Sequence, residues 1–436
     1  MNAPAPARRL FGTDGVRGVA GVFLTAELAL SLARAATARI GGTPRVLIIR
    51  DTRESGEMLE AAVSAGVAQA GGEALLGGVL PTPAAPLLIG RYGFDAAVVI
   101  SASHNPYRDN GIKFFGGDGF KLSDAVEAEI EAALAAPAAP AAQIGRVRQF
   151  HGALEDYLRA LHERFAALDL TGRRVALDCA NGAAHRAAPE IFRRLGAQVT
   201  VLADAPDGRN INDGCGSTHL ADLVALMREG GHDAGFAFDG DADRVLAVDR
   251  HGAVVDGDEL IALAATHRGV PGVAVTVMTN YGFHTAMAAA GIEVATTGVG
   301  DRYVLTELRE RGWALGGEQS GHIIDMDFVP SGDGTAAALL ALEALGETDL
   351  ADRHAMEKLP QTLVNVRVPD RAAFAGAAGV QALIAAEHAA LEGRGRVLVR
   401  PSGTEPLVRV MVEAPSAEEA DAVCGRIVDA VSSSLS

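Results

Sequence analysis

The chain is poor in cysteine and in aromatic residues, and it has no long apolar run. Its three cysteines, Cys179, Cys215 and Cys424, are too few and too far apart for a disulfide framework or a CxxC zinc site. No apolar stretch reaches the ~18 residues that a membrane span requires, and no leader-like segment follows the Ala-Pro-Arg N-terminus. We therefore expect a soluble protein of a reducing cytoplasm, without a membrane partner.

Positive charge is also scarce, because 38 Lys and Arg residues face 55 Asp and Glu residues, which gives a net charge of −17. This acidic field argues against nucleic acid as a partner. The only lysines are Lys113, Lys121 and Lys358, and a lysine in a polar loop stands out because it titrates where arginine does not. Hydrophobic residues make up 49% of the chain, enough for a sizeable core.

Short β-rich runs alternate with Ala-rich helical stretches, which is typical of α/β layering. Strands are predicted at 45–50, 95–100, 173–178, 233–238, 272–278 and 396–400. Helices are predicted at 54–70, 184–195, 258–267 and 302–311.

Three segments interrupt this pattern: the Ala/Pro run 135–142, the turn-rich strand pair 248–258 and the stretch 347–360. The last block then reads strand, helix, strand, strand, helix. We predict an α/β protein of four domains: three similar domains with mixed sheets, then a smaller α+β domain. The predicted domains cover residues 1–150, 151–252, 253–362 and 363–436.

Four polar loops each follow the end of a strand, one loop in each predicted domain, and the strand before the third loop is the short run 313–316. The loops cover residues 101–106, 239–244, 317–322 and 400–406. Open α/β sheets bind ligands at the carboxyl ends of their strands. We therefore expect one central cleft lined by all four loops.

Asp239, Asp241 and Asp243 alternate along the second loop. On an extended segment this spacing places three carboxylates on one side, where they would repel one another without a cation. An EF-hand is excluded, because Arg244 and Arg250 occupy its Gly and terminal Glu positions. Three ligands and one phosphate oxygen suit a catalytic Mg²⁺, whereas the alternative is a solvated acidic turn.

Ser103 lies in a loop rich in Ser, His and Asn, without the G-x-S-x-G context of a hydrolase nucleophile. A phosphoserine there would supply oxygens to a metal at the aspartates, and the alternative is an ordinary turn serine. Arg400, Ser402, Gly403 and Thr404 offer the parts of an anion-binding nest, and the alternative is a plain hairpin loop.

The third loop contains two side chains suited to sugar hydroxyls, Glu318 and Ser320. His322, at its end, is either a functional residue or a structural histidine. A Gly-punctuated loop at 11–18 carries one arginine, Arg17, and is a weak signal by itself.

Five motifs in order resemble the α-D-phosphohexomutase superfamily over essentially the whole chain. They are FGTDGVRG at 11–18, SASHNP at 101–106, DGDADR at 239–244, GEQSGH at 317–322 and RPSGTEP at 400–406. Within the superfamily, the chain looks like the bacterial phosphoglucosamine mutases, through DNGIKFF at 109–115, NINDGCGSTH at 210–219, GVGDRYV at 298–304 and Gln319. One departure is Leu220-Ala221, where family members often have Pro-Glu.

The resemblance implies reversible interconversion of glucosamine 6-phosphate and glucosamine 1-phosphate, which supplies UDP-N-acetylglucosamine synthesis. The reaction would pass through a phosphoserine enzyme and a glucosamine 1,6-bisphosphate intermediate, with that bisphosphate or glucose 1,6-bisphosphate as activator. One Mg²⁺ per chain would be held by Asp239, Asp241, Asp243 and the phosphate on Ser103. The resemblance leaves a homodimer open.

The resemblance also implies roles for the remaining site residues. Glu318 and Ser320 would bind sugar hydroxyls, and His322 would belong to the catalytic group. The phosphoserine would be bordered by Arg17, Lys113 and Arg244. The phosphate that does not react would be held by Arg400, Ser402, Gly403, Thr404 and Arg409.

Two other functions stay open from the sequence. One is a phosphomannomutase/phosphoglucomutase, which comparative kcat/KM values on the three sugars would separate. The other is a catalytically silent sugar-phosphate-binding regulator, which would be expected to lack Ser103 or part of the aspartate trio.

Overall fold

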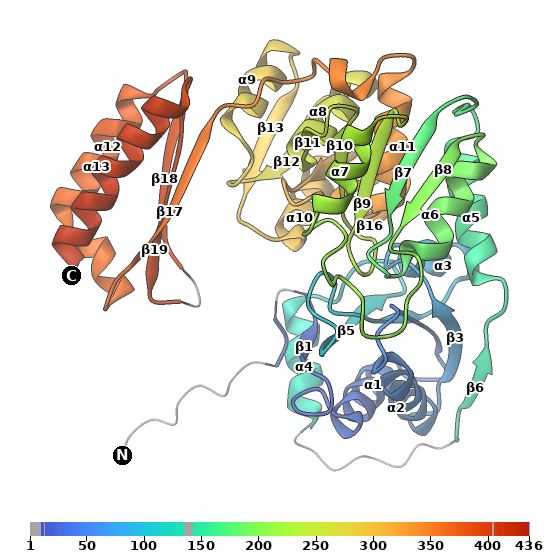
Figure 1. The fold of residues 1–436 in the computed structure, drawn as a ribbon. Helices are drawn as coiled ribbons and strands as arrows, with labels where there is room; N and C mark the ends of the chain where they lie inside the picture. The colour runs from blue at the N-terminus through green and yellow to red at the C-terminus, as the bar shows by residue number, and fades with distance from the viewer. Residues whose placement is uncertain (1–9, 13, 135–142, 403–404, 436) are drawn as a thin grey trace, which may run out of the picture. The chain divides into compact units, whose positions relative to one another are not determined.

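The structure is a computed structural model that describes residues 10–12, 14–134, 143–402 and 405–435. The chain divides into two compact units (Figure 1). The first comprises Met1–Val277 and Ala295–Arg353, and the second comprises Met278–Val294 and His354–Ser436. The predicted linker at 135–142 lies outside the described residues.

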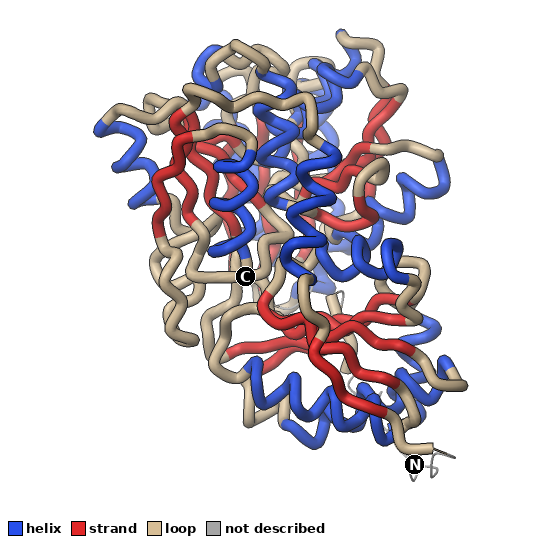
Figure 2. Tube along the Cα trace, turned by 90° about the vertical axis from the view of Figure 1, so that its right-hand side faces the viewer, coloured by secondary structure: helices blue, strands red, loops and turns tan. Residues whose placement is uncertain are grey.

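The N-terminal part of the first unit is built on a six-stranded mixed sheet. Its elements are β1 (Val16–Val19), α1 (Ala26–Ile40), β2 (Arg45–Arg50), α2 (Gly56–Gln69), β3 (Glu73–Val79), α3 (Ala84–Tyr92), β4 (Ala96–Ile100), β5 (Asp109–Gly116), α4 (Asp124–Leu134) and β6 (Arg146–Gln149). The strand order is β1-β5-β4-β2-β3-β6, with β5 antiparallel to both neighbours and the other pairs parallel. Helices α1, α2 and α4 cover one face (Figure 2), where Leu32, Val63 and Ile130 join the buried core.

A second mixed sheet of five strands follows along the chain. Its elements are α5 (Ala153–Arg164), β7 (Arg174–Asp178), α6 (Ala184–Arg194), β8 (Gln198–Leu202), α7 (Ala221–Glu229), β9 (Ala234–Phe238), β10 (Val245–Asp249) and β11 (Val254–Val255). The order is β11-β10-β9-β7-β8, and β7 is parallel to β8 and β9. The hairpin of β10 and β11 forms the antiparallel edge, so the predicted strand pair at 248–258 belongs to this sheet.

The third sheet also has five strands, in the order β13-β12-β14-β15-β16. The elements of this segment are α8 (Gly257–Arg268), β12 (Gly272–Thr276), α9 (Tyr281–Ala289), β13 (Glu293–Thr297), α10 (Asp301–Arg311), β14 (Leu315–Gly317), β15 (Ile323–Asp325), β16 (Val329–Gly332) and α11 (Gly334–Leu345), followed by the short helix η1 (Leu350–Asp352). Helix α11 contacts α8, β15 and, in the second sheet, β10. Both helices are buried along most of their length in these contacts.

The second unit carries a three-stranded antiparallel sheet in the order β17-β19-β18. Its C-terminal elements are β17 (Gln361–Arg367), η2 (Arg371–Gly376), α12 (Ala378–Ala390), β18 (Arg396–Pro401), β19 (Leu407–Glu413) and α13 (Ala417–Leu435). The segment 278–294 is tied to it through Tyr281, whose N–H donates to Glu413 Oε2 at 2.7 Å. Buried valines of β19 pack with Val423 and Ile427 of α13.

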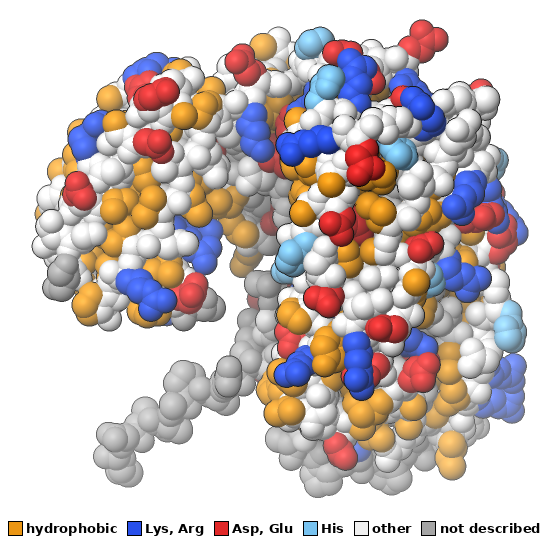
Figure 3. Space-filling view, viewed as in Figure 1, with side chains coloured by type: hydrophobic (Ala, Val, Ile, Leu, Met, Phe, Trp, Pro, Cys, Tyr) orange, Lys and Arg blue, Asp and Glu red, His pale blue; other side chains and the backbone are white. Residues whose placement is uncertain are grey.

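No helix in the described part of the chain is long and apolar enough to span a membrane. On the face that Figure 3 shows, Asp and Glu side chains lie among Lys and Arg side chains. Neither sign gathers there into one large patch. On this face, the negative side chains are therefore interspersed with positive ones rather than concentrated in one acidic region.

Candidate active site

Three of the four predicted loops meet in the first unit. The Ser103 hydroxyl, after β4, donates to Asp239 Oδ2, after β9, at 2.6 Å. The carbonyl of Gly321, after β14, accepts a hydrogen bond from Val245 N–H at 3.1 Å. The carboxyl ends of strands from three sheets thus place the three loops side by side. The fourth loop, 400–406, belongs to the second unit.

The three aspartates converge, but not in the way that the sequence predicts. The segment is a turn rather than an extended strand, because Ala242 N–H donates to Asp239 O at 3.1 Å and Ala242 has a φ of 59°. The expectation of an extended segment is therefore wrong. One carboxylate oxygen from each of Asp239, Asp241 and Asp243 lies within 4.8 Å of the others, and all three side chains are buried. The turn brings together the carboxylates that alternation along a strand would have aligned.

Lys113, on β5, is the cation at the centre of this cluster. Its side chain is 1% exposed, and Nζ lies 2.8 Å from Asp241 Oδ2, 3.2 Å from Asp14 Oδ2 and 3.5 Å from Asp243 Oδ2. Burial lowers the pKa of Lys113, but the carboxylates outweigh burial and the pKa is raised. Burial likewise opposes ionisation of Asp243, yet Lys113 and other cations lower the pKa of Asp243 well below its ordinary value. Lys113 is therefore held charged in a site shielded from water.

Asp239 behaves in the opposite way. Burial, followed by repulsion from Asp243 and Asp241, raises the pKa of Asp239 well above its ordinary value. The hydrogen bond from Ser103 only partly offsets this effect. The protein alone therefore disfavours the ionised form of this carboxylate, and a bound cation would favour it.

The carboxylates also have free coordination capacity. Asp241 Oδ1 and Asp243 Oδ1 are buried oxygens without a hydrogen-bond partner in the part of the chain that the structure describes. Buried polar atoms normally have partners, so two such oxygens in one cluster indicate a missing ligand. Carboxylate oxygens are the donors that a hard divalent cation prefers. The residues present therefore fit a metal of this class.

Two arginines flank the cluster and retain unused donors. Arg17 forms an ion pair with Asp14, and Arg244 Nε lies 3.7 Å from Asp243 Oδ1. Within the described residues, the buried Nε atoms of Arg17 and Arg244 have no hydrogen-bond acceptor. These donors indicate room for an anion beside the carboxylates.

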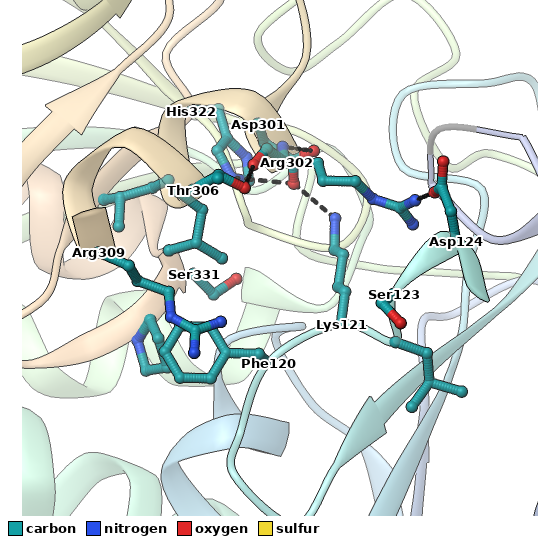
Figure 4. A pocket seen from close by; sticks show the side chains of 14 residues that line it. Phe120, Lys121, Ser123, Asp124, Asp301, Arg302, Thr306, Arg309, His322 and Ser331 are labelled. Carbon is teal, nitrogen blue, oxygen red and sulfur yellow. Dashed lines mark hydrogen bonds and ion pairs between the residues drawn. The ribbon is translucent and has the colours of Figure 1, made fainter. Parts of the chain in front are cut away.

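His322 lies between two carboxylates, with Nδ1 3.6 Å from Asp243 Oδ1 and Nε2 3.6 Å from Asp301 Oδ2. Gly332 N–H donates to Nε2 at 3.1 Å, so the neutral ring carries its proton on Nδ1. Burial lowers the pKa of His322, but Asp243 and Asp301 outweigh it and the pKa is raised. Figure 4 shows Asp301 reaching both His322 and Lys121, and Lys121 Nζ lies 2.5 Å from Asp301 Oδ2. The histidine thus links the acidic cluster to the ion pair between Lys121, which follows β5, and Asp301, the first residue of α10. These three side chains line a cavity of about 200 Å³.

Glu318 and Ser320 lie together in a tight turn, closed by a hydrogen bond from Gly321 N–H to Glu318 O at 3.0 Å. The Ser320 hydroxyl lies 3.5 Å from Glu318 Oε2. Glu318 Oε1 accepts a hydrogen bond from Gly300 N–H at 3.0 Å. Ser320 is exposed, so the pair presents polar atoms to solvent.

In the second unit, Arg400 and Arg409 are paired across β18 and β19. Burial and then the charge of Arg409 lower the pKa of Arg400. Arg409 Nε is buried without a hydrogen-bond partner among the described residues. The main chain of Ser402 is held by Leu407 O and by Arg371, whose Nη1 donates to Ser402 O at 2.6 Å. The predicted residues Gly403 and Thr404 lie outside the described residues.

The sequence reasoning missed several partners of these residues. Asp14 contacts Lys113, Lys121 and Arg17, and Thr82 donates through Oγ1 to Asp241 Oδ2 at 2.7 Å. Asp14 lies inside the motif at 11–18, and Lys121 is one of only three lysines, so there was a reason in the sequence to consider both as site residues. Thr82 follows β3 without any motif, and only the folded chain brings it to the site.

Comparisons with known proteins agree with the order of the sheets. Models of the phosphoglucomutase/phosphomannomutase family match domain I at residues 8–140, domain II at 155–252, domain III at 256–363 and the C-terminal domain at 363–430. The three α/β domains and the smaller C-terminal domain confirm the predicted fold class.

Curated relatives cover nearly the whole chain. A phosphoglucosamine mutase of Moorella thermoacetica is 51% identical over 430 residues, which cover 94% of this chain and 96% of the relative. A phosphoglucosamine mutase of Streptomyces avermitilis is 50% identical over 452 residues, which cover 98% and 99%.

Solved structures show the same fold. A phosphoglucomutase/phosphomannomutase family protein of Burkholderia thailandensis has a TM-score of 0.82 at 24% identity, covering 98% of this chain and 97% of that one. An N-acetylphosphoglucosamine mutase of Aspergillus fumigatus, in complex with GlcNAc-6P and magnesium, has a TM-score of 0.69 at 18% identity, covering 99% and 97%. With these matches over the length of the chain, the protein belongs to the phosphoglucosamine mutase family, isomerases of the phosphohexomutase superfamily that transfer a phosphoryl group.

Proposed function

We propose that the chain interconverts glucosamine 6-phosphate and glucosamine 1-phosphate through a phosphate carried on Ser103. The observation that carries this proposal is the position of the Ser103 hydroxyl. It is buried, bonded to Asp239 at 2.6 Å, and it lies at the carboxylates that surround Lys113. A phosphate carried on a hydroxyl so placed would lie beside the acidic cluster.

The reaction consists of two exchanges of one P–O bond for another. Phospho-Ser103 transfers its phosphoryl group to the free sugar oxygen, which yields glucosamine 1,6-bisphosphate. The bisphosphate turns around, and Ser103 accepts the other phosphoryl group. Glucosamine or glucose 1,6-bisphosphate would phosphorylate an enzyme that has lost its phosphate.

Positioning and charge neutralisation are the main demands of phosphoryl transfer. Lys113 holds a fixed positive charge 2.8 Å from Asp241, and Arg17 and Arg244 offer the buried Nε donors for phosphate oxygens. His322, between Asp243 and Asp301, orders the third loop against the carboxylates. These side chains would hold the transferring group without taking part in a covalent step.

We further propose that Asp239, Asp241, Asp243 and a phosphate oxygen on Ser103 bind one Mg²⁺. When bound, the ion supplies charge neutralisation for the transferring phosphoryl group. The two buried carboxylate oxygens without a hydrogen bond among the described residues support this assignment, as does the magnesium in the complex of the fungal mutase.

The sugar and its second phosphate require separate contacts. We propose that Glu318 and Ser320 bind sugar hydroxyls, because both present polar atoms at one turn. We assign the phosphate that does not react to Arg400, Ser402, Gly403, Thr404 and Arg409. The unused Nε of Arg409 supports an anion at that loop. We also propose the domain ranges predicted from the sequence, with the boundary after residue 252 moved to residue 255 because β11 pairs with β10 in the second sheet.

The decisive experiment replaces Ser103 with alanine. Intact-mass analysis should show a partly phosphorylated wild-type protein and no phosphate on the Ser103→Ala variant, which should lose nearly all turnover of glucosamine 6-phosphate. Ser434→Ala, at an exposed position of α13, serves as the matched control. Full activity of the Ser103→Ala variant would refute the phosphoserine mechanism.

A further inference from the structure

The backbone of Ser103 is held in an uncommon conformation. Its φ is 55°, in the left-handed region that residues other than glycine rarely adopt. Such a conformation is unfavourable for a residue other than glycine and persists only where the surrounding structure imposes it. The residues that impose it are therefore of interest for the reaction at this serine.

Arg53, which lies between β2 and α2, is fully buried beneath the Ser103 loop. Its Nη2 donates to Ser103 O at 2.9 Å and to Asn105 O at 2.8 Å. Its Nη1 donates to Pro106 O at 2.5 Å and to Asp109 O at 2.9 Å. One guanidinium thus holds four main-chain carbonyls of the loop, an arrangement that the single ammonium of a lysine could not reproduce.

Asp51 fixes the orientation of this guanidinium. Arg53 Nε donates to Asp51 Oδ2 at 2.8 Å, and Ser101 Oγ donates to the same oxygen at 2.6 Å. Ser101 Oγ in turn accepts a hydrogen bond from Ser103 N–H at 3.0 Å. Both the N–H and the C=O of Ser103 are therefore connected to one buried ion pair.

A second donor reaches the loop from the neighbouring sheet. Asn212 Nδ2, between β8 and α7, donates to Ser103 O at 2.9 Å and to Asn105 O at 3.1 Å. The packing is close: a Cβ added at Gly240 would lie 2.6 Å from Ser103 O and 2.8 Å from Asn212 Nδ2. The two lone pairs of the Ser103 carbonyl thus accept one hydrogen bond from each of two sheets.

We infer that Arg53 and Asn212 are positioning residues that aim the Ser103 oxygen at the acidic cluster. The inference rests on the proposed function, because it assigns the purpose of the clamp to phosphoryl transfer at Ser103. All the contacts of the two side chains given above are with the Ser103 loop and Asp51, and none is with the three aspartates. Their effect on the reaction is exerted through the main chain of Ser103.

The test compares the Arg53→Lys and Asn212→Gly variants with the wild-type enzyme under saturating Mg²⁺. A misplacement of the reacting oxygen by ~1 Å lowers the rate by about a hundredfold, so kcat of Arg53→Lys should fall by about that factor. Asn212→Gly removes one of the two donors and should lower kcat by about tenfold. Glycine suits this position, because Asn212 has a φ of 58°.

A positioning role lowers kcat but leaves KM unchanged, whereas a purely structural role lowers the melting temperature without lowering kcat. KM for glucosamine 6-phosphate should stay near the wild-type value in both variants, since neither residue is assigned to the sugar or its second phosphate. The control is Arg164→Lys, which alters another arginine paired with two carboxylates, Glu343 and Asp325, away from the Ser103 loop. It should lower the melting temperature without lowering kcat at 25 °C.

The outcomes separate the inference from the proposed function. A wild-type enzyme without mutase activity would overturn the proposed function itself. An active wild-type enzyme, together with folded variants that keep wild-type kcat, would overturn only the positioning role. If Arg53→Lys does not fold, Asn212→Gly decides: unchanged kcat refutes the inference, and a lower kcat at unchanged KM supports it.

Discussion

Replacing Lys113 with methionine would remove the charge at the centre of the acidic cluster while keeping the length of the side chain. The ammonium is 1% exposed and lies within 3.5 Å of Asp14, Asp241 and Asp243. Removing one partner of a buried ion pair typically costs about 3–5 kcal/mol, because the remaining charges are left uncompensated. At about 2 °C per kcal/mol for a large domain, the melting temperature should fall by about 6–10 °C.

Mg²⁺ gives this prediction a second readout. A divalent ion at the aspartates would compensate part of the charge that methionine leaves behind. We therefore expect Mg²⁺ to raise the melting temperature of the Lys113→Met variant by more than that of the wild type, in scans with EDTA or with millimolar Mg²⁺. Lys358→Met, at an exposed lysine, should change neither value appreciably and is the matched control.

The pH dependence has a defined sign. Burial raises the pKa values of Asp14 and Asp243, but Lys113 and other cations outweigh burial and lower both below the ordinary value. Stability that comes from a lowered carboxyl pKa is present at neutral pH and lost as the pH falls through the folded-state pKa. The difference in melting temperature between the wild type and the Lys113→Met variant should therefore be largest near pH 7 and should shrink as the pH falls below about 4. Equal melting temperatures at pH 7, with and without Mg²⁺, would refute the reasoning.

Three further predictions concern separate parts of the molecule. Asp241→Asn should lower kcat strongly and raise the Mg²⁺ requirement with the fold intact, and activity that survives exhaustive chelation would contradict a metal at this cluster. Arg400→Ala should weaken binding of both glucosamine 6-phosphate and the bisphosphate in calorimetry, whereas wild-type affinity for both would show that the phosphate site is misassigned. Burial raises the pKa of Asp333 from 3.8 to about 7 despite hydrogen bonds from Ala336 N–H and Tyr157. The stability that depends on the neutral carboxyl, about 4 kcal/mol at most, should therefore be lost as the pH rises from about 4 to about 7. Asp333→Asn should flatten that pH dependence in thermal scans, and an unchanged slope would exclude Asp333 as its source.

The sequence by itself determined a part of the secondary-structure elements and the chemistry of the loops. The predicted strand at 45–50 has the observed bounds, and the helix predicted at 184–195 is observed over Ala184–Arg194. Such elements are specified locally, by apolar runs and by glycines at their ends. The strand predicted at 272–278 ends earlier, at Thr276, because periodicity does not define the point where pairing stops. The loop motifs identified the residue types of a phosphohexomutase site because those types lie close together in the chain.

Only the tertiary structure decided how these residues meet. The three aspartates converge through a turn in which Ala242 adopts a positive φ, and no alternation rule predicts that conformation. Thr82 and Arg53 approach the site from loops after other strands, and they belong to none of the motifs. Asn212 approaches from another sheet, and the motif at 210–219 that contains it gave it no role. The physical reason is that a buried charge or a strained backbone is stabilised by whatever donors and acceptors the packing brings near. Those partners are separated by up to 159 residues along the chain, and only the folded sheets bring them together.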